Sequence, residues 1–236
     1  MAERATKGRE RLTRERVLSA AVDLADSQGL AAVSMRRLAA ELGVVPMAIY
    51  KHVADKDALV DGMLDRTLSE IEPTAPDDGW RASVRARVLA ARVVQLRHPW
   101  LRRVLETQVT RTPSVLAHIE AMIGLFRAGG FSDPLTHHVM HAFGSRMWGF
   151  SQELFEDPER PAEPVDPQVA AQLAQIFPNI AAVALAASHD DGTVVSYGCD
   201  DQFEFEFALD LLLDGFARLH EQGWLPPGRP SVTLST

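Results

Sequence analysis

Two short apolar stripes with helical spacing, separated by a turn that contains glycine, constrain the fold of this chain more than any other feature. The first stripe follows Ser34, whose side chain suits a helix N-cap, and ends before Gly43, which suits the position after a helix C-terminus. This stretch therefore predicts one short helix. Its apolar residues recur at the i, i+3, i+4 and i+7 spacing of one buried helix face: Met35, Leu38, Ala39 and Leu42.

The second stripe follows a turn of about three residues. It starts at Met47 or Ala48 and continues through Ile49 and Val53. Pro46 stands near the first helical position, where its fixed φ and missing N–H are tolerated. Two short helices joined by such a turn form the helix-turn-helix pattern, in which the second helix enters the major groove of DNA.

The exposed residues of these helices decide between a DNA reader and an ordinary helical pair. A solvated helix face would mix acidic and basic side chains, yet Glu41 is the only carboxylate between Ser34 and His52. The spacing alone leaves both readings open, and the cationic bias favours DNA binding. Hydrogen-bond donors fill the exposed positions: Arg36, Arg37, Tyr50, Lys51, His52 and Lys56.

The run from Gly29 to Leu64 resembles the DNA-binding domain of the TetR family of transcriptional regulators. It contains the Ala-Ile-Tyr-Lys-His segment that ends the recognition helix of that family and the Lys-Asp-Ala-Leu start of its next helix. Pro46, Met47 and Ala48 stand where other family members carry hydrogen-bonding side chains, so base readout there would rest on contact with thymine methyl groups. Such contacts do not identify the operator sequence. By position, the resemblance implies these DNA-binding residues: Ser34, Arg36, Val45, Pro46, Met47, Ala48, Tyr50, Lys51, His52 and Lys56.

The distribution of charge agrees with DNA binding by one end of the chain. The formal net charge of the 236 residues is −8. Residues 1–56 nevertheless carry ten Lys or Arg and seven Asp or Glu, whereas the other residues carry fourteen and twenty-five. A locally basic end can contact phosphates while an acidic body discourages attachment elsewhere.

Helix start and stop signals divide the chain into two domains. Residues 1–12 are polar and basic and are expected to be disordered, and residues 13–28 form an amphipathic helix that ends at Gly29. Asp55 caps a further helix, which stops after Ile71 at a segment rich in Pro and Asp. We therefore expect an N-terminal domain at 1–72, with a three-helix helix-turn-helix fold, and a C-terminal effector-binding and dimerisation domain at 73–236.

The second domain is predicted to be helical throughout. Phenylalanines at 203, 205 and 207 alternate as in a strand, but the apolar run that follows is too long for one. That run is apolar on more than one face, so it must bury against a subunit partner as well as its own core, with Leu212 or Phe216 at or beside the interface. The predicted fold class is all-α, with about nine to ten helices. Helical stripes cover 80–97, 99–109, 113–128, 133–155, 167–187 (kinked or broken at Pro178) and 201–221.

A second resemblance covers the C-terminal domain. The Phe-Pro-Asn break at 177–179 and the run Phe-Glu-Phe-Ala-Leu-Asp-Leu-Leu-Leu-Asp-Gly at 205–215 are similar to the regulatory domain of the tetracycline-repressor-like branch of the family. The similarity therefore extends over nearly the whole chain. In that branch two helices form a four-helix bundle with the partner subunit, which implies a homodimer through 133–155 and 201–221.

The same branch binds a small-molecule effector in this domain. Traced without a gap, its metal-ligating histidine falls near Gln108, a poor metal ligand, and the glutamate that acts through the metal falls on Glu153. We therefore expect an organic effector without an obligatory metal or other cofactor, in a cavity of apolar walls with a few polar groups. The expected ligand-binding residues are Arg87, Leu101, Gln108, Phe126, His138, His141, Trp148 and Glu153.

Competing functions have weaker support from the sequence. His137 and His141 share a helix face beside His138, a spacing that can chelate zinc, but no HExxH motif occurs and no third ligand is fixed, so we expect no metal site. The chain has no GxSxG, GxxxxGK[ST] or GxGxxG motif, and an enzyme would depend on unlinked carboxylates such as Glu106 or Glu153.

The sequence therefore predicts a homodimeric repressor that binds double-stranded operator DNA at a palindromic site and is released by a small molecule. The single cysteine, Cys199, fits a reducing cytoplasm. No stretch approaches the roughly 20 apolar residues of a membrane span, and the N-terminus lacks the apolar core of a signal peptide. A constitutive DNA-binding dimer without an effector stays open, and a helical enzyme is the least supported alternative.

Overall fold

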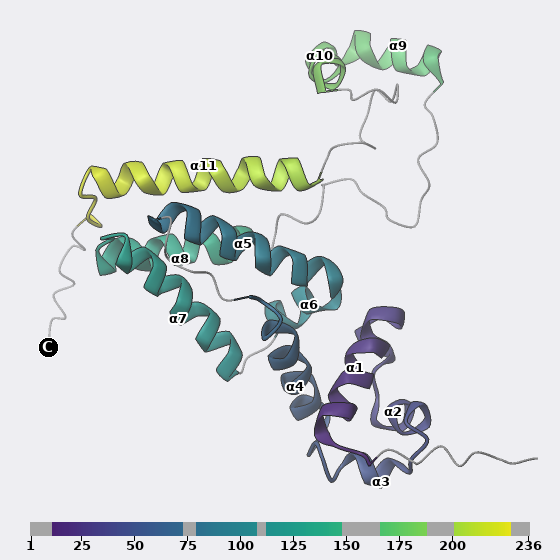
Figure 1. The fold of residues 1–236 in the computed structure, drawn as a ribbon. Coiled ribbons are helices and arrows are strands. Elements are labelled where there is room, and N and C mark those ends of the chain that lie inside the picture. Colours follow the sequence, from purple (N-terminus) through teal and green to yellow (C-terminus); the bar gives the residue numbers. More distant parts are fainter. Residues whose placement is uncertain (1–10, 73–78, 108–111, 148–165, 188–200, 228–236) are drawn as a thin grey trace, which may run out of the picture. The chain divides into compact units, whose positions relative to one another are not determined.

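The computed structural model describes residues 11–72, 79–107, 112–147, 166–187 and 201–227, and these form eleven α-helices and one short 3₁₀ helix, with no strand among them (Figure 1). The predicted all-α class is confirmed. The helices are α1 (Arg14–Gln28), η1 (Leu30–Ala32), α2 (Met35–Glu41), α3 (Pro46–Ile49), α4 (Lys56–Leu68), α5 (Gly79–Arg97), α6 (Trp100–Thr107), α7 (Pro113–Ala128), α8 (Asp133–Met147), α9 (Pro167–Ile176), α10 (Pro178–Ala187) and α11 (Asp201–Glu221).

The helix count exceeds the expected nine to ten because the chain breaks between α9 and α10. Phe177 leaves the helical conformation, with φ −124° and ψ 66°, and Pro178 begins the next helix. A proline disfavours the α conformation in the residue before it and cannot donate to the preceding turn. The break therefore lies where Pro178 predicted a kink or an interruption.

Oxygen-bearing side chains start three of the first four α-helices. Thr13, Ser34 and Asp55 each have extended backbones and accept a hydrogen bond from the backbone N–H three residues ahead, at 3.2, 3.3 and 2.8 Å. Each cap satisfies a donor that the helix cannot, and its loss costs about 1 kcal/mol. Gly43 ends the α2 region with φ 64°, a conformation that favours glycine, so the chain turns directly into α3.

Apolar side chains from α1 to α6 pack into one cluster. Leu38 of α2, Ile49 of α3 and Leu59 of α4 have no solvent exposure, and Trp100 and Leu101 of α6 join the same cluster. Burying a side chain of this size stabilises the fold by about 1.5–3 kcal/mol. The short helices α2 and α3 therefore gain their stability from this shared core rather than from their own length. Other buried members are Val17, Leu18, Ala21, Val22, Leu24, Ala25, Val33, Ala39, Val53, Met63, Leu64, Leu68, Ile71, Ala91, Val94 and Val104.

Contacts between Cα atoms divide the chain into two compact units, residues Met1–Phe131 and Ser132–Thr236. The first unit holds α1 to α7 and the second holds α8 to α11. The domain boundary expected between residues 72 and 73 lies within the first unit and stays a prediction.

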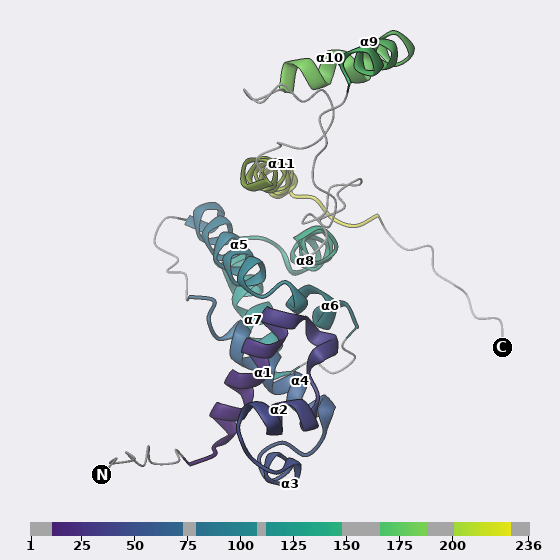
Figure 2. The same cartoon turned by 90° about the vertical axis from the view of Figure 1, so that its right-hand side faces the viewer.

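Helices α5 and α7 pack together in opposite directions within the first unit (Figure 2). The ring centroids of Trp80, at the start of α5, and Phe126, near the end of α7, are 5.9 Å apart. Arg87 in the middle of α5 contacts His118 in the first half of α7. Phe131 completes an aromatic cluster, with ring centroids 4.7 Å from Trp80 and 5.2 Å from Phe126. Edge and tilted contacts of this kind stabilise beyond the area that they bury.

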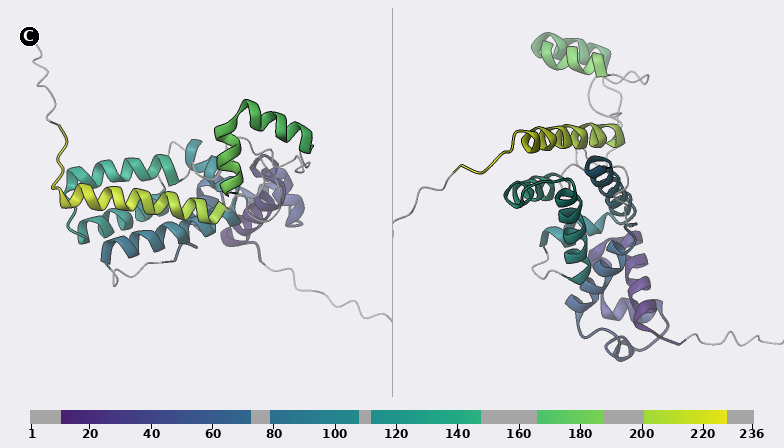
Figure 3. Two further views of the ribbon diagram at one scale, coloured as in Figure 1. Left: turned by 90° about the horizontal axis from the view of Figure 1, so that it is seen from above. Right: turned by 60° about the vertical axis from the view of Figure 1, so that its left-hand side comes forward.

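The second unit is organised by α8 and α11, which lie along each other (Figure 3). Phe143 of α8 and Phe216 of α11 are buried, with ring centroids 5.1 Å apart. Phe216 thus faces α8 of its own chain. Other buried side chains on the two helices are Leu135, Val139, Phe205, Leu209 and Leu213. Within this unit α9 also packs against α10.

No helix among the residues that the structure describes has the length and apolar character needed to span a bilayer.

Gly129 allows the close approach of α5 to the end of α7. A Cβ atom at this position would lie 2.5 Å from Cβ and 2.6 Å from Cγ of Trp80, atoms that cannot move without shifting the helix. We expect Gly129→Ala to lower the free energy of unfolding by about 1–3 kcal/mol, as overpacked cores do. Urea denaturation monitored by circular dichroism measures this change.

Gly124 supplies a matched control, because a Cβ atom there meets nothing within 4 Å and the residue lies inside α7. Gly124→Ala should leave stability unchanged or raise it by up to about 1 kcal/mol through helix propensity. Equal stability of Gly129→Ala and the wild type would contradict the close contact with Trp80.

Candidate nucleic-acid interface and effector site

Helix α3, which the sequence predicts to be the recognition helix, is a single turn with one side packed into the core. Val45 precedes it in extended conformation, Pro46 occupies its first turn, and Tyr50 follows its last residue. Ile49 is fully buried and Val53 is 4% exposed, so this side of the segment is anchored in the core. The side of α3 away from the core is exposed to solvent.

None of the predicted DNA-binding residues is buried in the structure. Val45, Met47 and Tyr50 are 68%, 69% and 45% exposed, although large apolar and aromatic side chains usually gain from burial. Such a cluster of exposed apolar groups is typical of a surface that binds a partner. Ser34, Arg36, Pro46, Lys51 and Lys56 are also exposed, and Ala48 and His52 are half-buried.

Arg37 has a role that the sequence did not reveal. Its backbone N–H donates to the Ser34 hydroxyl, and its guanidinium donates to the side-chain oxygen of Gln28 at the end of α1. This contact ties α2 to α1, although both Arg36 and Arg37 are exposed. The pairing of Gln28 with a residue nine positions later has no periodic signal in the sequence.

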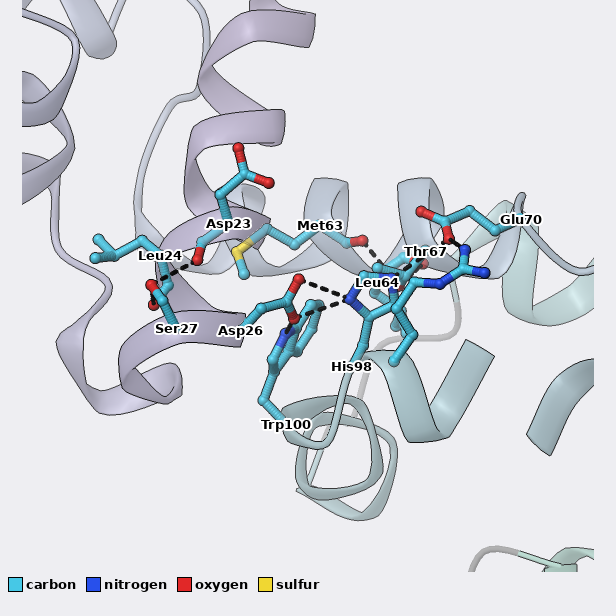
Figure 4. Close-up of polar contacts among 11 residues, drawn as sticks. Asp23, Leu24, Asp26, Ser27, Met63, Leu64, Thr67, Glu70, His98 and Trp100 are labelled. Carbon is cyan, nitrogen blue, oxygen red and sulfur yellow. Dashed lines mark hydrogen bonds and ion pairs between the residues drawn. The ribbon is translucent and has the colours of Figure 1, made fainter. Parts of the chain in front are cut away.

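A buried polar network joins α1 to the start of α6. His98 is 3% exposed, and its Nδ1 atom lies 2.8 and 3.0 Å from the two carboxylate oxygens of Asp26 (Figure 4). Because a carboxylate only accepts hydrogen bonds, Nδ1 carries the proton. The indole Nε1 of Trp100 donates to the same carboxylate at 2.6 Å. Asp26 therefore receives hydrogen bonds from two donors, His98 between α5 and α6 and Trp100 at the start of α6.

Glu70, just beyond α4, extends this network. Its carboxylate accepts from Arg97 at 2.7 Å and lies 3.4 Å from Nε2 of His98. An ion pair between Arg66 and Glu15 also ties α4 to α1. Helix α1 is thus held to α4 and to the junction of α5 and α6 by polar contacts as well as by the shared apolar core.

The predicted effector residues Arg87, Leu101 and Phe126 lie in the first unit, but in different surroundings. Leu101 and Phe126 are fully buried, Leu101 in the cluster of α1 to α6 and Phe126 against Trp80. Arg87 is half-buried, and its Nη2 atom lies 3.3 Å from Nδ1 of His118. Its Nε atom is shielded from solvent without a hydrogen-bond partner.

The predicted residues His138 and His141 are exposed on α8, in the second unit. The ring of His138 stands edge-on to Trp224 at 5.3 Å, beside a cavity of about 250 Å³. Small-molecule sites usually enclose roughly 300–1,000 Å³, so this cavity is small for an effector. It is lined by Leu135, His138, Val139, Ala142, Phe216, Leu219, Trp224, Pro226 and Pro227.

The remaining predicted effector residues, Gln108, Trp148 and Glu153, lie outside the described residues. The rings of His137 and His141 are 4.6 Å apart and those of His137 and His138 are 5.1 Å apart. Within the described ranges, no three or more His, Cys, Asp or Glu side chains gather in a way that could hold a metal ion. The effector-binding residues thus stay a prediction.

Comparison with known proteins matches both parts of the chain to regulator families. Residues 17–63 match the family model described as bacterial regulatory proteins, tetR family, and residues 72–219 match the tetracyclin repressor-like C-terminal domain. The HTH-type transcriptional repressor DrrR1 of Streptomyces coeruleorubidus is 42% identical over 125 residues, which cover 52% of this chain and 46% of the relative. This chain therefore spans about half the length of that curated relative.

Solved structures extend the likeness over most of the chain. ActR of Streptomyces coelicolor, in complex with actinorhodin, aligns with a TM-score of 0.70 and 28% identity, covering 91% of this chain and all of that one. The class D tetracycline repressor protein of Escherichia coli is 31% identical over 91 residues, which are 37% of this chain and 42% of the relative. These proteins are transcriptional regulators rather than enzymes.

The contact between Arg87 and His118 predicts a specific loss of stability in acid. Burial, and then the neighbouring Arg87 charge, lower the pKa of His118 to about 4, from 6.5 in the unfolded chain. Between these values the unfolded chain binds one more proton than the folded one. The stabilisation is complete above pH 6.5 and is lost as the pH falls towards 4, by about 3 kcal/mol in all.

We expect His118→Gln to remove this part of the pH dependence. The measurement is urea denaturation of both proteins from pH 7 to pH 4, and NMR titration of the His118 ring gives its pKa directly. An ordinary histidine pKa, or an identical loss of stability with pH in the variant, would show that the ring is not desolvated.

Proposed function

Because this chain belongs to the TetR family of bacterial transcriptional regulators, we propose that it is a repressor whose dimer binds a palindromic operator until a small molecule releases it. The observation that carries the proposal is the exposed surface around α3. Met47 on α3 and its flanking residues Val45 and Tyr50 are exposed, while Ile49 anchors the helix in the core. Such a geometry suits a rigid reader of the major groove.

The chemistry of this surface suits both parts of DNA recognition. Lys51 and Lys56 are exposed cations that can pair with phosphates, which supply affinity without sequence information. Met47 and its neighbours Pro46 and Ala48 present apolar atoms that fit thymine methyl groups in the groove. We therefore propose that the two types of residue divide affinity and specificity between them.

Dimerisation is proposed to use α8 and α11, corresponding to the predicted stretches 133–155 and 201–221. Phe203, Phe207 and Leu211 recur every four residues on α11 and are 60%, 55% and 57% exposed. The buried positions of the same helix, such as Phe205, face elsewhere. A second copy that covers the exposed stripe would form an isologous interface, and two recognition helices about 34–36 Å apart would fit successive major grooves.

Effector control is proposed to act through the contacts that hold the helix-turn-helix. Asp26 of α1 is bonded to His98 and Trp100, so a shift of the α5–α6 connection would carry the recognition helix with it. A ligand drives such a shift only by its differential affinity for the two states. The complexes of ActR with actinorhodin and with (S)-DNPA favour a small organic effector for this chain as well. Operator binding would place the protein in the cytoplasm.

Lys51 and Tyr50 provide the test of the DNA surface. On an operator selected from random duplexes, Lys51→Ala should weaken binding across sequences and reduce the slope of log K against log salt by about one counterion. Tyr50→Phe should weaken binding through the loss of one hydroxyl without unfolding the protein. Fluorescence anisotropy at several salt concentrations, with circular dichroism of each variant, measures both effects.

Arg103→Ala is a matched control for that experiment, because Arg103 is an exposed cation on α6. It should leave both affinity and salt slope unchanged. Wild-type binding by both Lys51→Ala and Tyr50→Phe would remove α3 from the DNA interface. If no compound in a library released the DNA, this result would favour a constitutive repressor.

Leu211 provides the test of the dimer. Leu211→Glu would bury an unpaired carboxylate in the proposed interface at a cost of several kcal/mol, so sedimentation should show monomers and operator affinity should fall. Leu225→Glu is the control, since Leu225 is 68% exposed beyond the end of α11. An intact dimer of Leu211→Glu would place the interface elsewhere.

A further inference from the structure

The cavity beside His138 in the second unit is built from three segments of the chain. Helices α8 and α11 supply the buried side chains of its lining, since Leu135, Val139 and Phe216 are at most 6% exposed. The chain beyond α11 supplies Trp224 as a further wall. The cavity therefore borders the packed apolar contact between two helices.

Backbone hydrogen bonds fix the wall that follows α11. Gly223 has φ 61°, a left-handed conformation that favours glycine, and its N–H donates to the carbonyl of His220 at 3.0 Å. The N–H of Trp224 donates to the carbonyl of Leu219, also at 3.0 Å. These two bonds form a Schellman motif, which reverses the chain at the end of a helix. The backbone of α11 thus holds Trp224 in place.

Side chains hold the same wall. The ring of Trp224 stands edge-on to that of His138 on α8, with centroids 5.3 Å apart, a favoured arrangement of aromatic rings. Pro226 and Pro227 also line the cavity, and their rings fix φ, so this segment has little conformational freedom to lose on binding. The cavity is therefore largely pre-formed, as ligand sites usually are.

The size and chemistry of the lining define what the cavity can hold. Its volume is about 250 Å³, whereas an apolar cavity of roughly 150 Å³ holds one benzene molecule. The described lining residues include no carboxylate, ammonium or guanidinium, and their polar side-chain groups are one imidazole and one indole. Aromatic and proline rings present flat apolar faces to a flat ligand. The cavity therefore has room for about two fused rings and no permanent charge to pair with an ion.

We propose that this cavity binds a small, uncharged, planar aromatic molecule of one or two rings. The site is additional to the effector site of the proposed function, because its volume lies below the usual range for drug-sized ligands. It does not depend on DNA binding. A ligand there would contact α8, α11 and Trp224 together, and so hold the chain after α11 against α8.

Indole is the probe, because it is planar, uncharged and has two fused rings. Isothermal titration calorimetry at pH 7.5 should give a dissociation constant of roughly 0.1–1 mM, as expected for a ligand of this size. Indole-5-carboxylate should bind at least about tenfold more weakly, since its charge would lose water without gaining a partner. No binding of indole, or equal binding of the two compounds, would overturn the inference.

NMR spectroscopy locates the bound indole. The side-chain N–H signal of Trp224, identified by its absence from the spectrum of Trp224→Ala, should shift as the probe is added. The corresponding signal of Trp100, which donates to Asp26 in the first unit, should not shift. An unshifted Trp224 signal would mean that indole binds elsewhere and would contradict the proposed site.

Two variants change the cavity in opposite directions. Ala142→Leu should fill it and Trp224→Ala should remove one wall, so each should weaken indole binding by about tenfold or more. Ala217→Leu is the matched control, because Ala217 is half-buried on α11 but outside the lining, and it should bind indole as the wild type does. Circular dichroism checks the fold of each variant, and Trp224→Ala lies beyond α11, so the helices do not depend on it. Wild-type affinity in both cavity variants would reject the site.

Sedimentation separates a ligand from a second copy of the chain as the occupant of the cavity. A ligand site predicts that indole leaves the association state of the protein unchanged. If indole or Ala142→Leu dissociated the protein into monomers, a side chain of a second copy would occupy the cavity, and the inference would be wrong. Loss of operator binding, by contrast, would reject the proposed repressor and leave this site unaffected.

Discussion

The carboxylate of Asp26 is the contact on which the arrangement of the first unit depends. It accepts hydrogen bonds from His98 and from Trp100, residues more than seventy positions away in the sequence. His98 is almost fully buried, so loss of Asp26 would leave its ring nitrogen and the Trp100 indole without an acceptor, at about 1–3 kcal/mol for each unpaired group. Directional bonds of this kind fix an orientation that an apolar core alone does not. The orientation of α1 relative to α6 is therefore set by these hydrogen bonds together with apolar packing.

That contact also links the two candidate activities of the molecule. The α1 helix supports α2 through the Gln28–Arg37 bond, and α2 supports α3 through the shared core. The α5 helix, which ends at the network, also carries Arg87 three turns earlier. An effector that moved α5 and an operator at α3 would thus act on opposite ends of one connected set of helices. The coupling between them is a difference in free energy between two arrangements of this set.

The sequence predicted the elements of this structure better than their contacts. Ser34, Asp55 and Pro178 act through local backbone chemistry, so a few neighbouring residues suffice to place helix starts and breaks. Asp26 meets His98 only through the tertiary fold, and one sequence has no signal for such a pair. Leu101 shows the limit for pockets, because the same apolar spacing describes a core residue and a cavity wall.

The brevity of α3 has a consequence for how operator preference can change. A helix of four residues is not stable by itself, so α3 is held in its conformation by the burial of Ile49 and Val53 in the core. The outward positions Val45 and Met47 contribute little to that order and are free to vary. If this surface reads the operator, as we propose, mutations there would alter operator preference while the folded population stays constant. The recognition surface is consequently evolvable: paralogues can diverge in their targets without first acquiring compensating mutations in the core.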